Sequence, residues 1–291
     1  MNFPIHAQKN TFKVMAWNIL HGGNDIENGP EKVAKIIKEI NPDIILMVET
    51  YGSGPFIADY LNCNFHLVAS KNTSLNDPSV NLSIFSKFPF GKRIDTEYPF
   101  YLGGIEIPIN GKIIRFFSNW FHYLPWNNEP EKMGKSVEEL LEWEKTESRH
   151  EMIQKVLPYL KKFANETDSI PMIFGGDMNS LSHLDWTNKT KTIHNNLVVP
   201  WNATEILADL GLIDSYRKEN PNPITHPGVT WDKKGRKDSH RIDYIFYKGK
   251  SIKSIKSNSY NAYFNESIII NDKQIPYPSD HGIVVTTFEF R

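Results

Sequence analysis

Asp280 and His281 are adjacent and stand just before the apolar run 283–288. Burying a carboxylate and an imidazole side by side costs free energy unless a charged group meets them. Asp is a hard oxygen ligand for divalent cations, and the charge of His changes near neutral pH. An Asp-His pair also arises often by chance, so it indicates chemistry only together with other polar clusters.

Polar side chains also stand at the ends of four other short apolar runs. They are Asn18 after 13–17, Glu49 after 42–48, Asp177 and Asn179 after 170–176, and Asp243 within 240–247. Such runs are typical of strands buried on both faces, and the ends of neighbouring strands converge on one rim of a sheet. Carboxylates meeting there would repel one another unless a cation neutralised them. The pattern therefore predicts a divalent metal site.

The elements that would position these residues follow from the same patterns. Strands are predicted at 12–18, 43–49, 64–69, 80–86, 104–109, 112–121, 170–176, 242–248 and 283–290. Helices are predicted at 30–40, at 136–164 with a kink or break at Pro158, and at 202–210 with Asn202 as a cap. Segments 181–200 and 215–240 are expected to be long surface loops. Many strands with a few long helices favour two sheets covered by helices.

Bulk properties narrow the class of protein. A length of 291 residues allows one large domain, and we expect an N-terminal extension at 1–11 and a single catalytic domain at 12–291. The net charge of −1 disfavours an enzyme that grips long duplex DNA through its phosphates. Cys63 is the single cysteine, which excludes an internal disulfide and a cysteine-based zinc cluster.

Two further patterns are missing from the sequence. No run of apolar residues is long enough for a membrane span, so we expect a soluble protein. The first residues do not have a signal-peptide pattern, which leaves open the cytoplasm and a secreted or periplasmic mature form.

Taken together, the clusters resemble the endonuclease/exonuclease/phosphatase superfamily, which includes DNase I, abasic-site endonucleases, sphingomyelinases and inositol-polyphosphate phosphatases. The matching residues are Trp17 and Asn18, Glu49, Gly176 to Asn179, Arg241 to Tyr244, and Ser279 to His281. The resemblance implies an α/β fold, a four-layer α/β/β/α sandwich of two mixed, mainly antiparallel sheets. It also implies a Mg²⁺-dependent phosphoesterase, with Mn²⁺ as an alternative ion.

The resemblance also implies roles for individual residues. Glu49 is expected to be the main metal carboxylate, with Asn18 and Asp280 beside it. Asp177 resembles the residue that orients or deprotonates the attacking water, and Asn179 the donor to a phosphate oxygen. His281 resembles the histidine on the scissile phosphate, and Asp243 the residue that fixes its tautomer.

One stretch departs from the family pattern. Most members carry a further histidine at the end of a central strand, where this chain has Trp120. Residues two apart on a strand share a face, so His122 could substitute for it about 7 Å further along. The alternative is that catalysis depends on His281 and the metal alone.

Substrate-binding candidates are Trp120, His21, His226, Trp231 and Arg241. His21 and His226 could equally be ordinary loop residues. The basic run 233–237 could attract an anionic substrate or be a solvated loop. Two or three tryptophans could wall a pocket for a sugar or base. Arg149 is expected to be a structural ion-pair partner.

The function that these features favour is hydrolysis of a phosphodiester or phosphomonoester. We expect the substrate to be small or medium sized: a sugar, inositol, lipid-headgroup or nucleotide phosphate, rather than long nucleic acid. One alternative is a DNA or RNA nuclease of the same superfamily. Another is a non-catalytic binding protein that retains the fold, for which Trp120 is the only support. The oligomeric state is left open.

Overall fold

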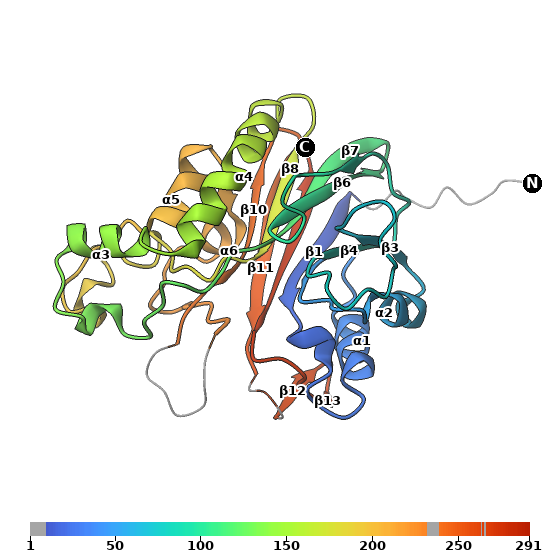
Figure 1. The fold of residues 1–291 in the computed structure, drawn as a ribbon, viewed down its shortest axis with the longest axis horizontal. Helices are drawn as coiled ribbons and strands as arrows, with labels where there is room; N and C mark the ends of the chain where they lie inside the picture. Colours follow the sequence, from blue (N-terminus) through green and yellow to red (C-terminus); the bar gives the residue numbers. More distant parts are fainter. Residues whose placement is uncertain (1–9, 232–238, 263, 265) are drawn as a thin grey trace, which may run out of the picture.

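Two six-stranded sheets form the centre of the molecule (Figure 1). The computed structural model describes residues 10–231, 239–262, 264 and 266–291. The first sheet has the order β11-β14-β1-β2-β4-β3 and the second β5-β6-β7-β8-β10-β9. Each sheet has one parallel pair, β1 with β2 and β7 with β8, and its other pairs are antiparallel. Both sheets are therefore mixed and mainly antiparallel, as predicted.

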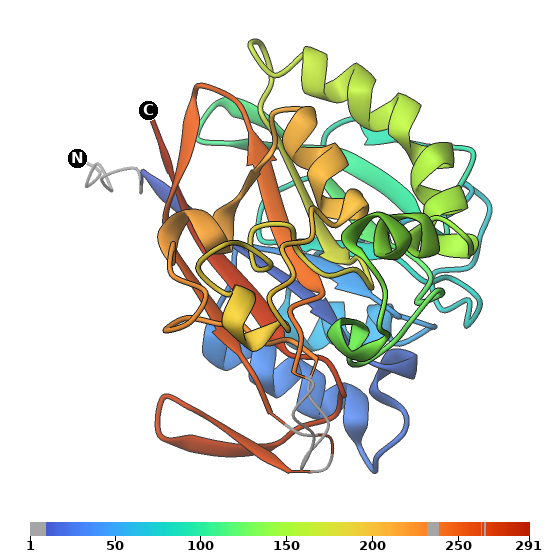
Figure 2. The ribbon, with the colours of Figure 1, turned by 90° about the vertical axis from the view of Figure 1, so that its left-hand side faces the viewer.

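The strands have the following bounds. The first sheet contains β1 (Thr11–Asn18), β2 (Ile44–Val48), β3 (Asn64–Leu67), β4 (Ser83–Ser86), β11 (Ile252–Tyr260) and β14 (Ile283–Phe290). The second contains β5 (Arg93–Ile94), β6 (Leu102–Ile109), β7 (Lys112–Trp120), β8 (Met172–Asp177), β9 (Ile213–Asp214) and β10 (Asp243–Lys248). A separate hairpin is formed by β12 (Ser267–Ile270) and β13 (Lys273–Pro276), and it projects at the bottom of Figure 2.

Helices cover the outer face of each sheet (Figure 1). The first sheet carries α1 (Gly29–Ile40) and α2 (Gly54–Leu61). The second carries α4 (Ser148–Asn165) and α5 (Asn202–Asp209), with α3 (Val137–Glu144) beyond them. α6 (Ser215–Glu219) contacts β10 and β11. Short 3-10 turns lie at His21–Gly23, Pro130–Lys132 and Lys191–Ile193.

Three apolar layers explain this stacking. The inner faces of the two sheets meet in one cluster, which includes Phe12, Ile44, Phe116 and Ile245. A second cluster lies between the first sheet and α1 and α2, and a third between the second sheet and α4 and α5. Strands buried on both faces need helices to cover their outer sides. The result is the predicted four-layer α/β/β/α sandwich.

The prediction for 136–164, a long helix kinked or broken at Pro158, is wrong about where the helix breaks. The chain forms two helices, separated at 145–147, and Pro158 lies inside α4. Ser136 begins α3 with a capping box in which Glu139 is the partner. The break falls where Glu144 turns inward and accepts a hydrogen bond from the backbone of Asn202. A tertiary contact, rather than the proline, therefore sets the break.

Other local predictions also need correction. Asn202 is the first residue of α5 and its side chain makes no cap. Segment 181–200 is not simply a surface loop, because Trp186 and Val199 are buried in a cluster with α3. The basic run 233–237 lies outside the described residues, as does most of the expected N-terminal extension.

Strands β5, β9, β11, β12 and β13 and helices α2 and α6 were not predicted. Several are short, and β11 is a partly exposed edge strand with few apolar residues. No helix in the described part of the chain is long and apolar enough to cross a membrane.

Candidate active site

Five strand ends converge on one rim of the sandwich. β1 and β2 run parallel, with Asn18 opposite Val48, so Asn18 and Glu49 lie side by side. Across the sandwich, Asp177 at the end of β8 pairs with Asp243 at the start of β10. β14 runs antiparallel to β1, which brings the segment before Ile283 to the same rim. The sequence order of these residues therefore bears no relation to their closeness in space.

Asn18 links the two sheets through its side-chain amide. Its Nδ2 donates to Glu49 Oε1 at 3.0 Å and to Asp177 Oδ2 at 3.2 Å. Its Oδ1 accepts from the backbone N–H of Leu20 at 3.0 Å, which fixes the orientation of the amide. The structure places Asn18 in hydrogen-bond contact with Glu49, the predicted metal carboxylate, and its nitrogen also contacts Asp177.

Glu49 is held from both sides. Its φ of 57° is left-handed, and its backbone N–H donates to Asn81 Oδ1 at 3.0 Å. Its Oε2 accepts from the backbone N–H of His21 at 2.9 Å. Sequence analysis missed Asn81, which is fully buried just before β4. An Asn directly before an apolar run was the available signal.

Asp177 and Asn179 form a compact unit on the other side. The backbone N–H of Asn179 donates to Asp177 Oδ1, and its side-chain Nδ2 to Asp177 Oδ2, each at 2.9 Å. Asn179 Nδ2 also donates to the carbonyl of Phe121 at 2.9 Å. Behind it, Arg149 donates to the carbonyl of Asn179. Arg149 was expected to make an ion pair, but this buried guanidinium bonds to backbone carbonyls instead.

His281 is bonded to Asp243 as the resemblance implied. Its Nδ1 lies 3.0 Å from Asp243 Oδ2, and its Nε2 lies 3.8 Å from Asp177 Oδ2. Its carbonyl accepts from Trp17 Nε1 and the Tyr277 hydroxyl, and its N–H donates to Ser279 Oγ. These bonds fix the imidazole ring, and the contact of Nδ1 with Asp243 leaves Nε2 on the side of Asp177.

Burial and an opposite charge nearby have opposing effects on the pKa of His281 and on that of Asp177. Burial alone would lower the pKa of His281, but Asp243 and Asp177 outweigh it and raise that pKa well above its usual value. Burial is also the largest cause that raises the pKa of Asp177 to about 8, with Asp243 adding to it and His281 opposing it. The site therefore favours an imidazolium beside a carboxyl group of unusual basicity.

A cleft of about 290 Å³ opens over these groups. It is lined by Leu20, Glu49, Trp120, Tyr123, Trp126, Asp177, Asn179, Trp231, Asp280 and His281. Of the substrate-binding predictions, Trp120 and Trp231 lie in this lining. Trp126 was predicted only as one of several tryptophans that could wall a pocket, and Tyr123 was not predicted, because their loop lies outside any strand signal.

The other substrate-binding candidates do not line the cleft. His21 is exposed, with its ring bonded to Asp25, and it reaches the site only through its backbone. His226 is an exposed loop residue bonded to Thr225. The prediction that Arg241 binds the substrate is wrong, because its buried guanidinium is paired with Asp185 and Asp214. That pairing makes Arg241 a structural residue directly before Ile242 and Asp243.

His122 does not share the position of Trp120. β7 ends at Trp120, so the two-residue alternation of a strand does not extend to His122. Its Nδ1 lies 2.7 Å from Ser148 Oγ and accepts from the backbone N–H of Leu124 at 3.2 Å. The ring is in edge contact with Trp120 at 5.7 Å and does not line the cleft. The expectation that both side chains point into the cleft is therefore wrong.

A divalent cation fits the oxygen donors on the rim. Asp280 Oδ1 is buried without a hydrogen-bond partner among the described residues. Burial, followed by the charge of Glu49 among its other causes, raises the pKa of Asp280, as expected where carboxylates crowd together. Glu49 and Asp280 thus offer hard ligands of the kind that Mg²⁺ and Mn²⁺ take.

Asp177, Asp243 and His281 also bring donor atoms within 4.8 Å of one another. That trio is a poorer cation site, because a metal needs the neutral imidazole and this one holds its proton tightly.

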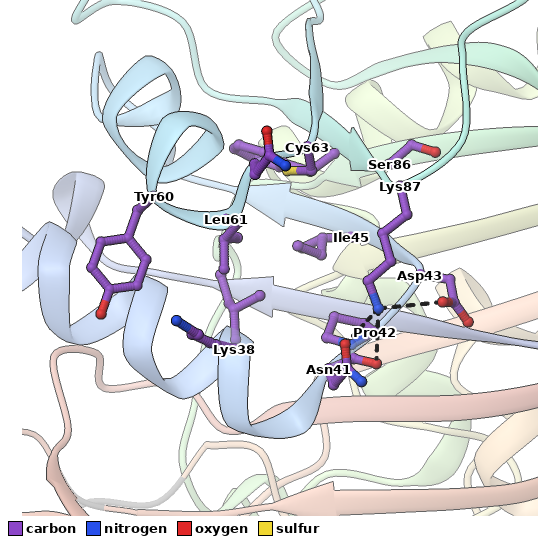
Figure 3. A pocket seen from close by; sticks show the side chains of 13 residues that line it. Lys38, Asn41, Pro42, Asp43, Ile45, Tyr60, Leu61, Cys63, Ser86 and Lys87 are labelled. Carbon is purple, nitrogen blue, oxygen red and sulfur yellow. Dashed lines mark hydrogen bonds and ion pairs between the residues drawn. The ribbon is translucent and has the colours of Figure 1, made fainter.

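A larger cavity of about 330 Å³ lies at the opposite end of β2, between the ends of α1 and α2 (Figure 3). Its floor includes Ile45 and Leu61, and its rim includes Lys87, which bonds to Asn41 and Asp43. The described residues that line this cavity form no cluster of carboxylates and imidazoles like the one in the cleft over His281. We therefore place the candidate active site in the smaller cleft.

Comparison with known proteins agrees with this geometry. Residues 15–281 match the model of the Endonuclease/Exonuclease/phosphatase family. The chain belongs to this family. A relative in Caenorhabditis elegans, the uncharacterized protein F14F9.5, is 28% identical over 98% of this chain and 93% of its own length.

Solved structures of the family share the fold at low identity. The TDP2 of D. rerio complexed with a single strand DNA product has a TM-score of 0.59 at 15% identity, covering 96% of this chain and 99% of that chain. The human Nocturnin catalytic domain with bound sulfate gives 0.59 at 17%, covering 97% and 95%. An AP endonuclease from Archaeoglobus fulgidus gives 0.58 at 19%, covering 94% and 98%. At these identities the likeness shows the fold alone.

Proposed function

We propose that this chain is a divalent-cation-dependent phosphoester hydrolase acting on small or medium-sized substrates, with residues 12–291 as one catalytic domain. The observation that carries the proposal is the convergence of Glu49, Asp177 and Asp280 with the His281–Asp243 pair around one cleft. Membership of a family of metal-dependent phosphoester hydrolases supports it.

Each group has a defined task in this reaction. Glu49 and Asp280 would hold Mg²⁺ or Mn²⁺, which when bound neutralises these carboxylates and draws charge from the phosphoryl oxygens. His281, kept protonated by Asp243, faces a non-bridging oxygen and stabilises the charge that develops there. Asn179 donates from its side-chain amide in the same region.

Asp177 is the proposed base. Its raised pKa makes it a stronger proton acceptor than an ordinary carboxylate, and two bonds from Asn179 orient it. It would orient the attacking water and take up its proton. The intact set of groups argues against a non-catalytic binding protein.

The test is hydrolysis of bis(p-nitrophenyl) phosphate by the wild type with Mg²⁺ or Mn²⁺, and with excess EDTA. Glu49→Gln is expected to lower kcat/KM by at least about 10²-fold at fixed cation, because it removes the main cation ligand. Glu142→Gln, an exposed change on α3, is the matched control and should keep full activity. Full activity of the wild type in excess EDTA would rule the mechanism out.

The second candidate is a nuclease, and one structural neighbour is described with a single strand DNA product. Cleavage of an oligonucleotide held through several phosphates would weaken steeply with salt. A small phosphoester with one phosphate would show a shallow dependence. Measuring kcat/KM for both substrate classes between low and physiological salt separates the two candidates.

A further inference from the structure

Four of the ten residues that line the catalytic cleft are aromatic: Trp120, Tyr123, Trp126 and Trp231. Trp120, Trp126 and Trp231 are half-buried and Tyr123 is exposed, so each keeps part of its surface accessible. They stand beside the groups that would hold the phosphate. The space next to the reacting phosphorus is therefore walled by rings.

Trp120 and Trp126 are held in place by their surroundings. Trp120 is in edge contact with Phe100 at 5.4 Å as well as with His122. Trp126 is in edge contact with His240 at 5.6 Å, and its Nε1 donates to Asn128 Oδ1 at 2.5 Å. These contacts fix the rings, which lowers the entropy cost of binding against them.

Three rings of the wall do not fill the cleft by stacking on each other. Among the ring contacts of the described residues, none joins Trp120, Tyr123 and Trp126 to one another. The ring of Trp231 lies against His281, with centroids 4.9 Å apart. These four rings border the cleft of about 290 Å³.

The charged residues of the cleft lining also favour a stacking role for the rings. No Lys or Arg is found among the described residues of the lining, and its charged groups are those already assigned to the reaction. The indole N–H of Trp126 is already bonded to Asn128. The described wall therefore has few groups that could read the hydrogen-bonding edge of a ligand, but it has π-faces for stacking.

We propose that this aromatic wall binds a planar ring carried by the phosphoester substrate, either an aryl group or an unstacked nucleobase, by stacking. The proposal rests on the proposed function, because it names the substrate class of the same cleft. The proposal explains why Trp120 stands where the family resemblance implies a histidine. At that position a planar ring replaces an ionisable side chain, which favours binding of the group esterified to the phosphate.

Calorimetric titration tests the wall without requiring turnover. Methyl phosphate, cyclohexyl phosphate, phenyl phosphate and thymidine 5′-monophosphate are titrated into the wild type with Mg²⁺ present. Phenyl phosphate or the nucleotide is expected to bind at least about tenfold more tightly than methyl phosphate, within the range of base–aromatic stacking. Cyclohexyl phosphate is similar in size but not planar, and should gain less.

Trp126→Leu should reduce the preference for the planar ring to within about twofold. Trp126 bonds to Asn128 and contacts His240, so the change is expected in the ratio of the affinities for planar phosphates and methyl phosphate. Trp120→Leu is the second variant, in case the first does not fold. Phe56→Leu, an exposed aromatic on α2 away from the cleft, is the matched control and should keep the wild-type preference.

The outcomes separate this proposal from the proposed function. Equal affinities for methyl, cyclohexyl and planar phosphates, or a preference that survives in both Trp variants, would overturn the aromatic wall even with hydrolysis intact. A ring preference that depends on Trp126, in a protein without hydrolase activity, would refute the proposed function and leave the wall supported. Whether phenyl phosphate or the nucleotide binds more tightly identifies the source of the ring.

Discussion

Asn18 shows how much of the site depends on a single amide. Its side-chain nitrogen bridges Glu49 from one sheet and Asp177 from the other, while its backbone carbonyl accepts from Ser279 Oγ. One short side chain thus touches the cation side and the base side of the site. A small shift of the Asn18 amide would therefore alter its contacts with both Glu49 and Asp177.

His122 gives the sharpest residue-scale prediction. Because its ring bonds to Ser148 behind the wall and does not line the cleft, His122→Ala should keep kcat within about threefold of the wild type. The loss of the ring that supports Trp120 should raise KM for a substrate with a planar group. Steady-state kinetics on one substrate checks both parameters.

A drop in kcat of about 10²-fold or more would return His122 to the reaction as an acid–base group. Ser148→Ala serves as the control, because it removes the bond to His122 and leaves the ring itself in place.

At the scale of elements, the strand ends were the most predictable part of the site. Asn18, Glu49, Asp177 and Asp243 each lie beside an apolar run, so the sequence alone indicates that they share a rim. The burial of both faces made the core strands easy to recognise. The same local signals indicate the fold class, because two kinds of periodicity alternate along the chain.

The rest depended on tertiary contacts that no local pattern encodes. Trp126 comes from a loop that other segments position, and Asn81 acts through a backbone contact with Glu49. Arg241 looked like a ligand for an anion because its two acidic partners, Asp185 and Asp214, lie far from it in the sequence. The break between α3 and α4 likewise follows a contact of Glu144 with Asn202.

Strand β3 carries a pH-dependent contribution to stability. Burial, with the charge of Arg93, lowers the pKa of His66 to about 4, whereas an unfolded chain has the ordinary value near 6.5. Above pH 6.5 both states are neutral and His66 adds no pH dependence. As pH falls from about 6.5 to 4 the unfolded state takes up a proton first, so stability falls.

Urea unfolding of the wild type and of His66→Gln at pH 7 and pH 5 measures this contribution. The wild type is expected to lose about 1–2 kcal/mol more than the variant over that interval. Equal losses in both proteins would contradict a buried neutral imidazole. Other titrating groups are common to the two proteins, so they cancel in the difference.

At the scale of the whole molecule, the cation should stabilise the fold. Glu49 follows β2 and Asp280 precedes β14 in the first sheet, so a cation held by the two would tie together segments that lie far apart in the sequence. At about 100 times its dissociation constant, a ligand of the native state adds about 2.7 kcal/mol. For a chain of this size we expect Mg²⁺ to raise Tm by about 4–8 °C.

Differential scanning calorimetry with Mg²⁺ and with EDTA checks this increase. Glu49→Gln should lose the Mg²⁺-dependent rise, and without cation its Tm should equal or slightly exceed that of the wild type, because one repelling carboxylate is gone. A full Mg²⁺-dependent rise in Glu49→Gln would show that the cation binds elsewhere.

The position of β14 determines when the site can form during synthesis of the chain. β14 is the last strand of its sheet to leave the ribosome, yet it lies between β1 and β11, and the segment just before it supplies Asp280 and His281. Until it arrives, β1 lacks its antiparallel neighbour and the reaction lacks its imidazolium. A nascent chain can collapse around its earlier strands, but it remains chemically inert. In the proposed reaction, closure of this sheet and completion of the site would thus come in one late step.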